Sequence, residues 1–218
     1  AVAGSEGNFN NNNRADVGSS FQGITGNNSV AIAGSNGDFN NGNRATAFGE
    51  NAQAFAGIGT GPGTGDNSGN IAWANDTGSG GNTTIAVAGI GDSNFDNRAV
   101  ATNSGAGSTT VAAAGALGTG NADNTATATN TANDALTVAV SGSGGNTNTE
   151  NVASATNSGA DARTAAVSGT GGDSNLSNTA TATNNGAGNT TGAAAGYLTT
   201  GSEFLDVTAS NGEVKEKP

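Results

Sequence analysis

The side chains that could do chemistry in this chain are carboxylates, amides and hydroxyls, because cysteine, histidine and methionine are all absent. Their absence removes disulfides, thiol nucleophiles, the usual zinc sites and histidine acid–base catalysis. Paired carboxylates in a groove remain as a route to catalysis, as in glycoside cleavage. The acidic residues here are spread through turn sequences and form no long column at any repeat position. We therefore predict that the protein is not an enzyme and has no catalytic residues.

Calcium is the one metal whose chemistry suits these turns, because it takes hard oxygen ligands in flexible loops. The turn sequences 91–97 and 172–175 offer such oxygens, and the candidate ligands are Asp92, Asp96 and Asp173. The competing interpretation is that these are ordinary solvated turn residues. No other cofactor is expected.

Threonine at alternate positions is the third chemical feature. Segments 125–129 and 179–183 both read Thr-Ala-Thr-Ala-Thr, and alternate residues of a strand share one face. Thr127, Thr181 and the single tryptophan, Trp73, are predicted to fall in one outward column. A flat face of this kind would suit ice or glycans, although threonine is also simply a good outward strand residue.

The elements that position these side chains follow from a repeat of 27 residues, which indicates a stack of identical coils. Asparagine marks the repeat, and stacked asparagines hydrogen-bond amide to amide along an axis. A turn-forming role for the same residues is the alternative. The first predicted ladder contains Asn43, Asn70, Asn97, Asn124, Asn151 and Asn178. The second contains Asn103, Asn130, Asn157, Asn184 and Asn211.

Each repeat carries two short strands. The first ends in small residues and glycine, as in 138–142, and the second reads Asn-x-Ala-x-Ala-x-Asn, as in 178–184. A column of alanines fits where two sheets lie close together and leave no room for larger side chains. We predict an all-β solenoid of about eight two-stranded coils, with two parallel sheets and a thin alanine and valine core.

The repeat is less regular near the N-terminus. We expect one domain over residues 1–212, with irregular aromatic-rich coils at 1–69, regular repeats at 70–212 and a charged tail at 213–218. Charged residues and proline can block an open sheet edge, whereas an uncapped end can stack on another subunit. The predicted assembly interface contains Val2, Phe9, Phe21, Phe204, Leu205 and Val207.

Composition limits the partners and the location. The formal net charge is −11 with six basic residues, so nucleic acid is not an expected partner. No apolar run reaches the length of about 20 residues that crosses a membrane. The chain starts at Ala1 and is rich in glycine, asparagine, threonine and alanine. We interpret this as a mature exported protein that is secreted to the cell surface.

The strand–turn–strand coil with asparagine closing each strand resembles the curlin repeats of curli-type fibres. Residues 28–34 and 43–57 are similar to the head repeats of trimeric autotransporter adhesins. Both resemblances imply surface structure, fibre formation or adhesion. The expected function is that of an extracellular fibre or biofilm-matrix subunit, amyloid-like in its stacking, which self-associates head to tail. The alternatives are a surface adhesin, with cell-surface glycans as partners, or an ice-binding module.

Overall fold

The computed structural model describes residues 1–4, 10–18, 28–60 and 66–218, and every regular element in these ranges is a strand. No helix in the described ranges is long and apolar enough to cross a membrane. The strands are β1 (Val2–Ala3), β2 (Arg14–Val17), β3 (Val30–Ala33), β4 (Arg44–Phe48), β5 (Ala52–Ile58), β6 (Ile71–Asp76), β7 (Thr83–Ile90), β8 (Arg98–Asn103), β9 (Thr109–Ala114), β10 (Thr125–Asn130), β11 (Leu136–Ser141), β12 (Val152–Asn157), β13 (Arg163–Ser168), β14 (Thr179–Asn184), β15 (Thr190–Ala195), β16 (Asp206–Ser210) and β17 (Val214–Lys217).

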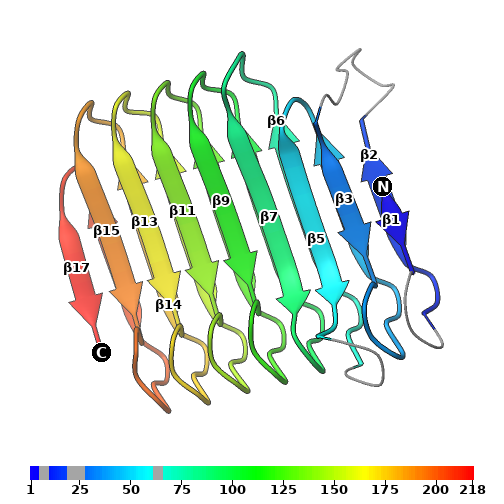
Figure 1. The fold of residues 1–218 in the computed structure, drawn as a ribbon. Coiled ribbons are helices and arrows are strands. Elements are labelled where there is room, and N and C mark those ends of the chain that lie inside the picture. Colours follow the sequence, from blue (N-terminus) through cyan, green and yellow to red (C-terminus); the bar gives the residue numbers. More distant parts are fainter. Residues whose placement is uncertain (5–9, 19–27, 61–65) are drawn as a thin grey trace.

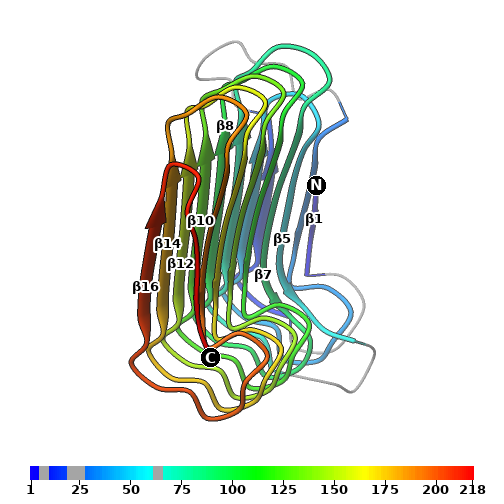
Figure 2. The same cartoon turned by 90° about the vertical axis from the view of Figure 1, so that its left-hand side faces the viewer.

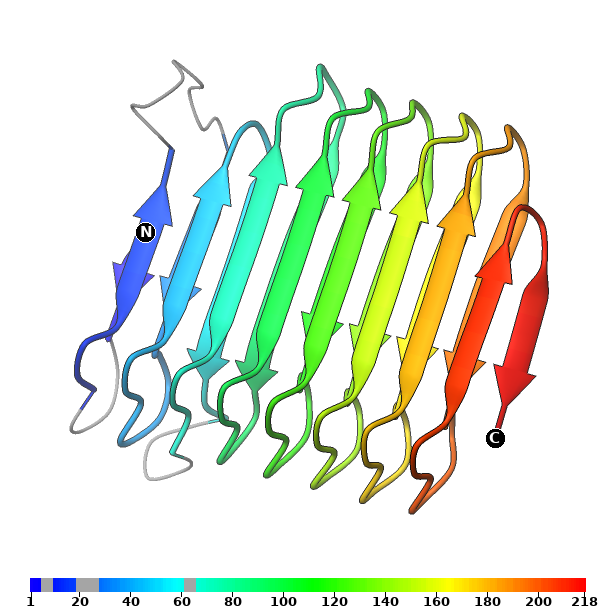
Figure 3. The same cartoon turned by 180° about the vertical axis from the view of Figure 1, so that it is seen from behind.

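The chain winds as a solenoid, with odd-numbered strands in one sheet and even-numbered strands in the other. The first sheet has nine strands and the second has eight. Within each sheet, a strand pairs in parallel with the next odd-numbered or next even-numbered strand, as β10 does with β12. Figure 3 shows the eight-stranded sheet from behind. Equivalent residues meet in register, so that Ala126 pairs with Ala153 and Ala153 with Ala180. The predicted two-sheet solenoid with a 27-residue repeat is confirmed.

The core between the two sheets is almost entirely alanine. Figure 2 shows the two sheets face to face when the molecule is turned by 90°. In the eight-stranded sheet the inward alanines at 126, 128, 153 and 155 have no exposed surface, and Ala112 and Ala139 are equally buried in the opposite sheet. An alanine buries little apolar area, so hydrophobic burial contributes little free energy per residue.

The first asparagine ladder is confirmed, and it is fully hydrogen-bonded. From Asn43 to Asn178, each side-chain Nδ2 donates to Oδ1 of the preceding rung at 3.0–3.1 Å. The same Nδ2 also donates to a backbone carbonyl of the next coil, as Asn124 does to Asn148 at 2.7 Å. The ladder begins one coil earlier than predicted, at Asn13, and its last Oδ1 accepts the backbone N–H of Leu205.

The second ladder runs through Asn103, Asn130, Asn157 and Asn184, with amide bonds of 2.8–2.9 Å. It begins at a carboxylate, because Asn103 donates to Oδ1 of Asp76 at 3.1 Å. The prediction that it continues to Asn211 is wrong. β16 ends at Ser210, and Asn211 has a positive φ of 44° in the turn that follows. Its exposed side chain accepts the backbone N–H of Asn185 instead.

A third buried column escaped the sequence analysis. It lies three residues before the first ladder, and its asparagines have no exposed surface. Each Oδ1 accepts the backbone N–H of the equivalent residue in the next coil, at 2.9–3.1 Å. The members with these bonds are Asn67, Asn94, Asn121, Asn148, Asn175 and Ser202. The motif Asn-x-x-Asn, repeated every 27 residues, was the available signal.

The C-terminal segment is a strand, which corrects the expectation of a charged tail after residue 212. β17 pairs with β15, and Lys215 and Lys217 stand in register with Ala193 and Ala195. Residues 213–217 are exposed, because no further coil covers this end of the stack. An edge strand tolerates alternating charges when one of its sides faces water.

The alanine core predicts a steep penalty for larger side chains. Changing both Ala153 and Ala180 to leucine adds volume at two adjacent, fully buried positions. Overpacking of this kind costs about 1–3 kcal/mol per site, so we expect a large fall in the melting temperature measured by circular dichroism. The matched control changes Ser154 and Thr181 to leucine on the outward side of the same strands. Equal melting temperatures for the two double variants would contradict a closely packed two-sheet core.

Candidate functional surfaces

In the part of the chain that the structure describes, no three acidic side chains gather into a group that could hold a metal ion. Of the calcium candidates, Asp92 and Asp173 occupy one turn column, three coils apart. Asp92 accepts from the Thr60 hydroxyl at 3.0 Å, and Asp173 accepts from the backbone N–H of Asn146 at 2.7 Å. Asp96 lies in a different column, so the structure does not bring these three together.

The outward side of the eight-stranded sheet carries a regular array of hydroxyls. In each strand the array residues alternate with the buried core, and equivalent residues pair from coil to coil. With a rise of about 3.3 Å per residue and about 4.8 Å between strands, neighbouring hydroxyls are spaced on a grid of roughly 6.6 by 4.8 Å. The array contains Thr102, Thr127, Thr129, Ser154, Thr156, Thr181, Thr183, Thr208 and Ser210.

Trp73 stands at the N-terminal side of this array, in the predicted column. It pairs in register with Val100, which pairs with Thr127. Its side chain is 42% exposed, and its ring meets Phe48 edge-on with 6.0 Å between centroids. The two rings form an aromatic step beside the hydroxyl array.

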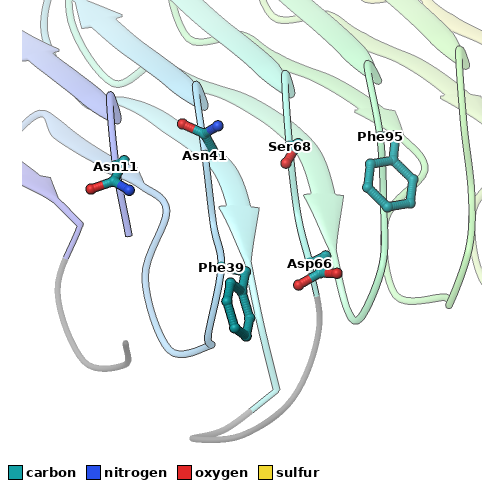
Figure 4. A pocket seen from close by; sticks show the side chains of 6 residues that line it. All are labelled: Asn11, Phe39, Asn41, Asp66, Ser68 and Phe95. Atoms are coloured by element: carbon teal, nitrogen blue, oxygen red, sulfur yellow. The ribbon is translucent and has the colours of Figure 1, made fainter. Parts of the chain in front are cut away.

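A shallow depression lies on the turns that join the even strands to the preceding odd ones. It has a volume of about 430 Å³. Asn11, Asn41, Ser68 and Phe95 follow one another in successive coils, and Figure 4 shows the rings of Phe39 and Phe95 on either side of Asp66. Aromatic rings beside amide and carboxylate groups can contact both the apolar and the polar faces of a small ligand. Sequence reasoning did not identify this group.

The residues predicted for assembly have different environments. Val2 in β1 is 43% exposed and Phe204 is 72% exposed. Val207 is 4% exposed because its side chain fills a core position, and Leu205 packs partly against the same core. The prediction of Val207 as a surface contact is therefore wrong. Phe9 and Phe21 lie outside the described residues.

The first ladder and the third asparagine column both end at the last coil, where other residues replace asparagine. Leu205 occupies the rung after Asn178, and Ser202 occupies the rung after Asn175. Leu205 has no side-chain acceptor for a following rung. Lys215 and Lys217 continue the register of two inward alanines with charged side chains. The C-terminal end therefore differs chemically from the interior coils.

Of the residues that the structure describes, Asp76 is the one buried carboxylate within the ladders. It is 1% exposed, and its Oδ1 accepts from Gly78, Asn82 and Asn103. Its Oδ2 has no hydrogen-bond partner among the described residues. Burial raises the pKa of Asp76 above 3.8, the nearby charge of Glu50 adds to this, and the three hydrogen bonds oppose it. A buried carboxylate thus occupies a position that suits a neutral amide.

We predict that Asp76→Asn stabilises the fold at neutral pH. In the other coils the corresponding Nδ2 donates to the carbonyl two residues on, as Asn103 does to Gly105 at 3.0 Å. An amide at 76 would satisfy a buried polar atom whose unmet hydrogen bond costs about 1–3 kcal/mol. The measurement is the melting temperature as a function of pH, with Asp161→Asn, an exposed turn residue, as control.

The sign of the pH dependence follows from the raised pKa. In the wild type, the contribution of Asp76 to the free energy of unfolding is complete below pH 3.8, where the carboxyl is protonated in both the folded and the unfolded chain. This contribution is lost as the pH rises through the pKa of the folded state. The advantage of Asp76→Asn should therefore be greatest near neutral pH and shrink on acidification. A variant that melts below the wild type at neutral pH would contradict this account.

No family model, curated protein or solved structure matches this chain. Functional inference therefore depends on its own surfaces. The described residues present two sheet faces, several shallow depressions, and the edges of β1, β2, β16 and β17 at the ends of the stack.

Proposed function

We propose that this protein is an extracellular structural protein that is not an enzyme and that self-associates into a surface filament or matrix. The observation that carries the proposal is the open stack. Among the described strands, each terminal strand has a neighbour on one side only, β1 and β2 at one end and β17 and β16 at the other. An edge of unpaired backbone groups is a template for pairing with another chain.

The internal use of the polar side chains supports a structural role. The buried amides of the ladders bond to each other and to backbone carbonyls, so they are unavailable to a ligand. Parallel, in-register stacking with amide ladders is the arrangement that gives cross-β assemblies their stability. The predicted resemblance to curlin repeats points to the same class of protein.

The proposed axial contact joins the C-terminal coil of one subunit to the N-terminal coil of the next. Leu205 and Ser202 do not extend the amide ladders, so the joint would use backbone edges and apolar side chains such as Val2 and Phe204. Lys215 and Lys217 would stand opposite the alanine columns of the neighbour and oppose close stacking, as inward-pointing charges do at protected edges. These two lysines would therefore limit filament growth.

We expect Lys215→Ala combined with Lys217→Ala to increase filament length and lower the concentration at which filaments form. The measurement is negative-stain electron microscopy together with light scattering over a dilution series. Glu216→Ala is the control, because it removes a charge from the opposite side of the same strand. Filaments in neither the wild type nor the double variant would refute axial assembly.

A second candidate function is binding of ice or glycans by the hydroxyl face. The regular array from Thr102 to Ser210 favours it, since such a grid can hold ordered water. We expect measurable thermal hysteresis or ice-recrystallisation inhibition, lost when Thr127 and Thr181 are changed to tyrosine. The control changes Val138 and Val167 to tyrosine on the opposite sheet. Equal ice activity in both variants, or none in the wild type, would exclude an ice-binding role for this face.

A further inference from the structure

The outward face of the nine-stranded sheet is apolar over most of its length. Its side chains alternate with the buried alanines, and they pair in register along two main columns, with a short third column beside them. This apolar face consists of Val30, Ile32, Gln53, Phe55, Ile58, Ile85, Val87, Ile90, Val111, Ala113, Val138, Val140, Ala165, Val167, Gly192 and Ala194.

The apolar face is partly exposed and carries no charge. Apart from Val30, which is 38% exposed, its members keep an intermediate exposure. Figure 1 looks onto this sheet, and the described loops lie at the ends of its strands. The charged side chains next to it are Arg163, at the start of β13, and Glu216 on β17. A continuous apolar patch of this extent on a soluble chain marks an interaction surface.

Side-chain size falls along the apolar face from the N-terminal to the C-terminal coils. β5 presents Phe55 and Ile58, and β7 presents Ile85 and Ile90. β9 and β11 present valine and alanine, β13 presents Ala165 and Val167, and β15 presents Gly192 and Ala194. The side chains of the apolar face therefore project further from the sheet at its N-terminal end than at its C-terminal end.

We propose that the apolar face binds the same face of a second copy, with the two solenoid axes antiparallel. A two-fold axis parallel to the strands would place β5 opposite β15, β7 opposite β13 and β9 opposite β11. The bulky end of each copy would then lie over the small-residue end of the other, which gives two sheets packed at an even separation. Parallel axes would set Phe55 against its own copy and leave a gap over Gly192.

The size of the face is adequate for such a dimer. From β3 to β15 it spans six strand spacings, about 29 Å, and its columns cover about 15–20 Å along the strands. This gives roughly 500 Å² per partner in projection, which reaches the lower limit of about 1,000 Å² in total for a specific interface. The lack of charge also favours a second copy, because a chain of net charge −11 would otherwise repel itself at close contact.

This lateral interface is distinct from the proposed axial joint, and the two contacts can be tested by separate experiments. The first measurement is the mass of the full chain by light scattering after size exclusion, at concentrations from about 5 to 200 µM. We expect twice the chain mass of 20.6 kDa. Changing Val138 and Val140 to glutamate, in the centre of the apolar face, should give the monomer mass.

The matched control changes Thr127 and Ser154 to glutamate on the opposite sheet and should keep the dimer mass. Circular dichroism melting of both variants shows that the fold is retained. A second variant, Gly192→Val, fills the small-residue end. Its added Cβ would lie 3.6 Å from Val214 within the same chain, an ordinary contact, and Gly192 has no positive φ. It should therefore weaken the dimer without unfolding the monomer.

The relative orientation of the two copies can be tested by disulfide formation between introduced cysteines, since the chain has no cysteine of its own. An equimolar mixture of Phe55→Cys and Ala194→Cys chains should form a mixed disulfide dimer on oxidation, whereas each variant alone should remain uncross-linked. Self-cross-linking of each variant alone would overturn the antiparallel arrangement. A wild-type monomer at all concentrations, or a dimer that survives the changes at Val138 and Val140, would overturn the interface. Loss of axial filaments alone would leave these readouts unchanged.

Discussion

The hydrogen bond between equivalent asparagine amides in successive coils is the interaction on which this structure depends. An alanine core provides little apolar burial, while each buried amide has two donors and one acceptor oxygen to satisfy. Asn124 meets this requirement with Asn97 below, Asn148 of the next coil and the backbone N–H of Asn151. The bond to Asn97 exists only because the preceding coil carries a side-chain acceptor at the same place. The strict repeat of 27 residues is a consequence of that requirement.

The same ladder determines where glycine must stand. Gly142 has a φ of 55°, and a Cβ built on it would lie 2.5 Å from the Asn124 side-chain amide, which the hydrogen bonds of the ladder hold in place. Gly57 and Gly115 stand in the same relation to Asn43 and Asn97. The glycine that lies one residue before or after the last residue of each odd-numbered strand from β3 to β15 therefore does two things: it allows the left-handed turn, and it leaves the space that the amide column fills. Either a side chain at this glycine or a larger residue in the ladder would disrupt the stack.

The repeat made the fold predictable, because residues spaced by 27 could be assigned to faces by alternation alone. The two sheets, the inward alanines and the first ladder followed from that assignment. The valines that were also expected in the core lie on the outward side of the nine-stranded sheet, and of the described valines only Val207 is buried. The other predictions that failed concern the last described coil, where the repeat pattern is no longer continued by a following strand. Asn211 fits the spacing, yet β16 ends one residue before it and its φ becomes positive. Val207 was assigned to an interface because it belongs to the C-terminal strand expected to meet a neighbouring subunit, but its register with Ala180 places it in the core. The depression at Phe39 and Phe95 was missed for a different reason. Its residues Asn41, Ser68 and Phe95 keep the 27-residue spacing, but their types change from coil to coil, so the repeat gave no signal.

Placing the polar chemistry inside the stack leaves function to the outer surfaces, and these surfaces are unequal. The eight-stranded sheet presents hydroxyls and the nine-stranded sheet presents valine, isoleucine and phenylalanine, although both have the same alanine interior. Core packing cannot account for this difference, because the outward residues do not touch the core. Strand propensity alone would also suit threonine on both faces. An apolar outward face is unfavourable for a chain that stays alone in water. The asymmetry therefore supports the proposed lateral dimer, in which one face would be covered by a second copy and the other would remain in contact with solvent.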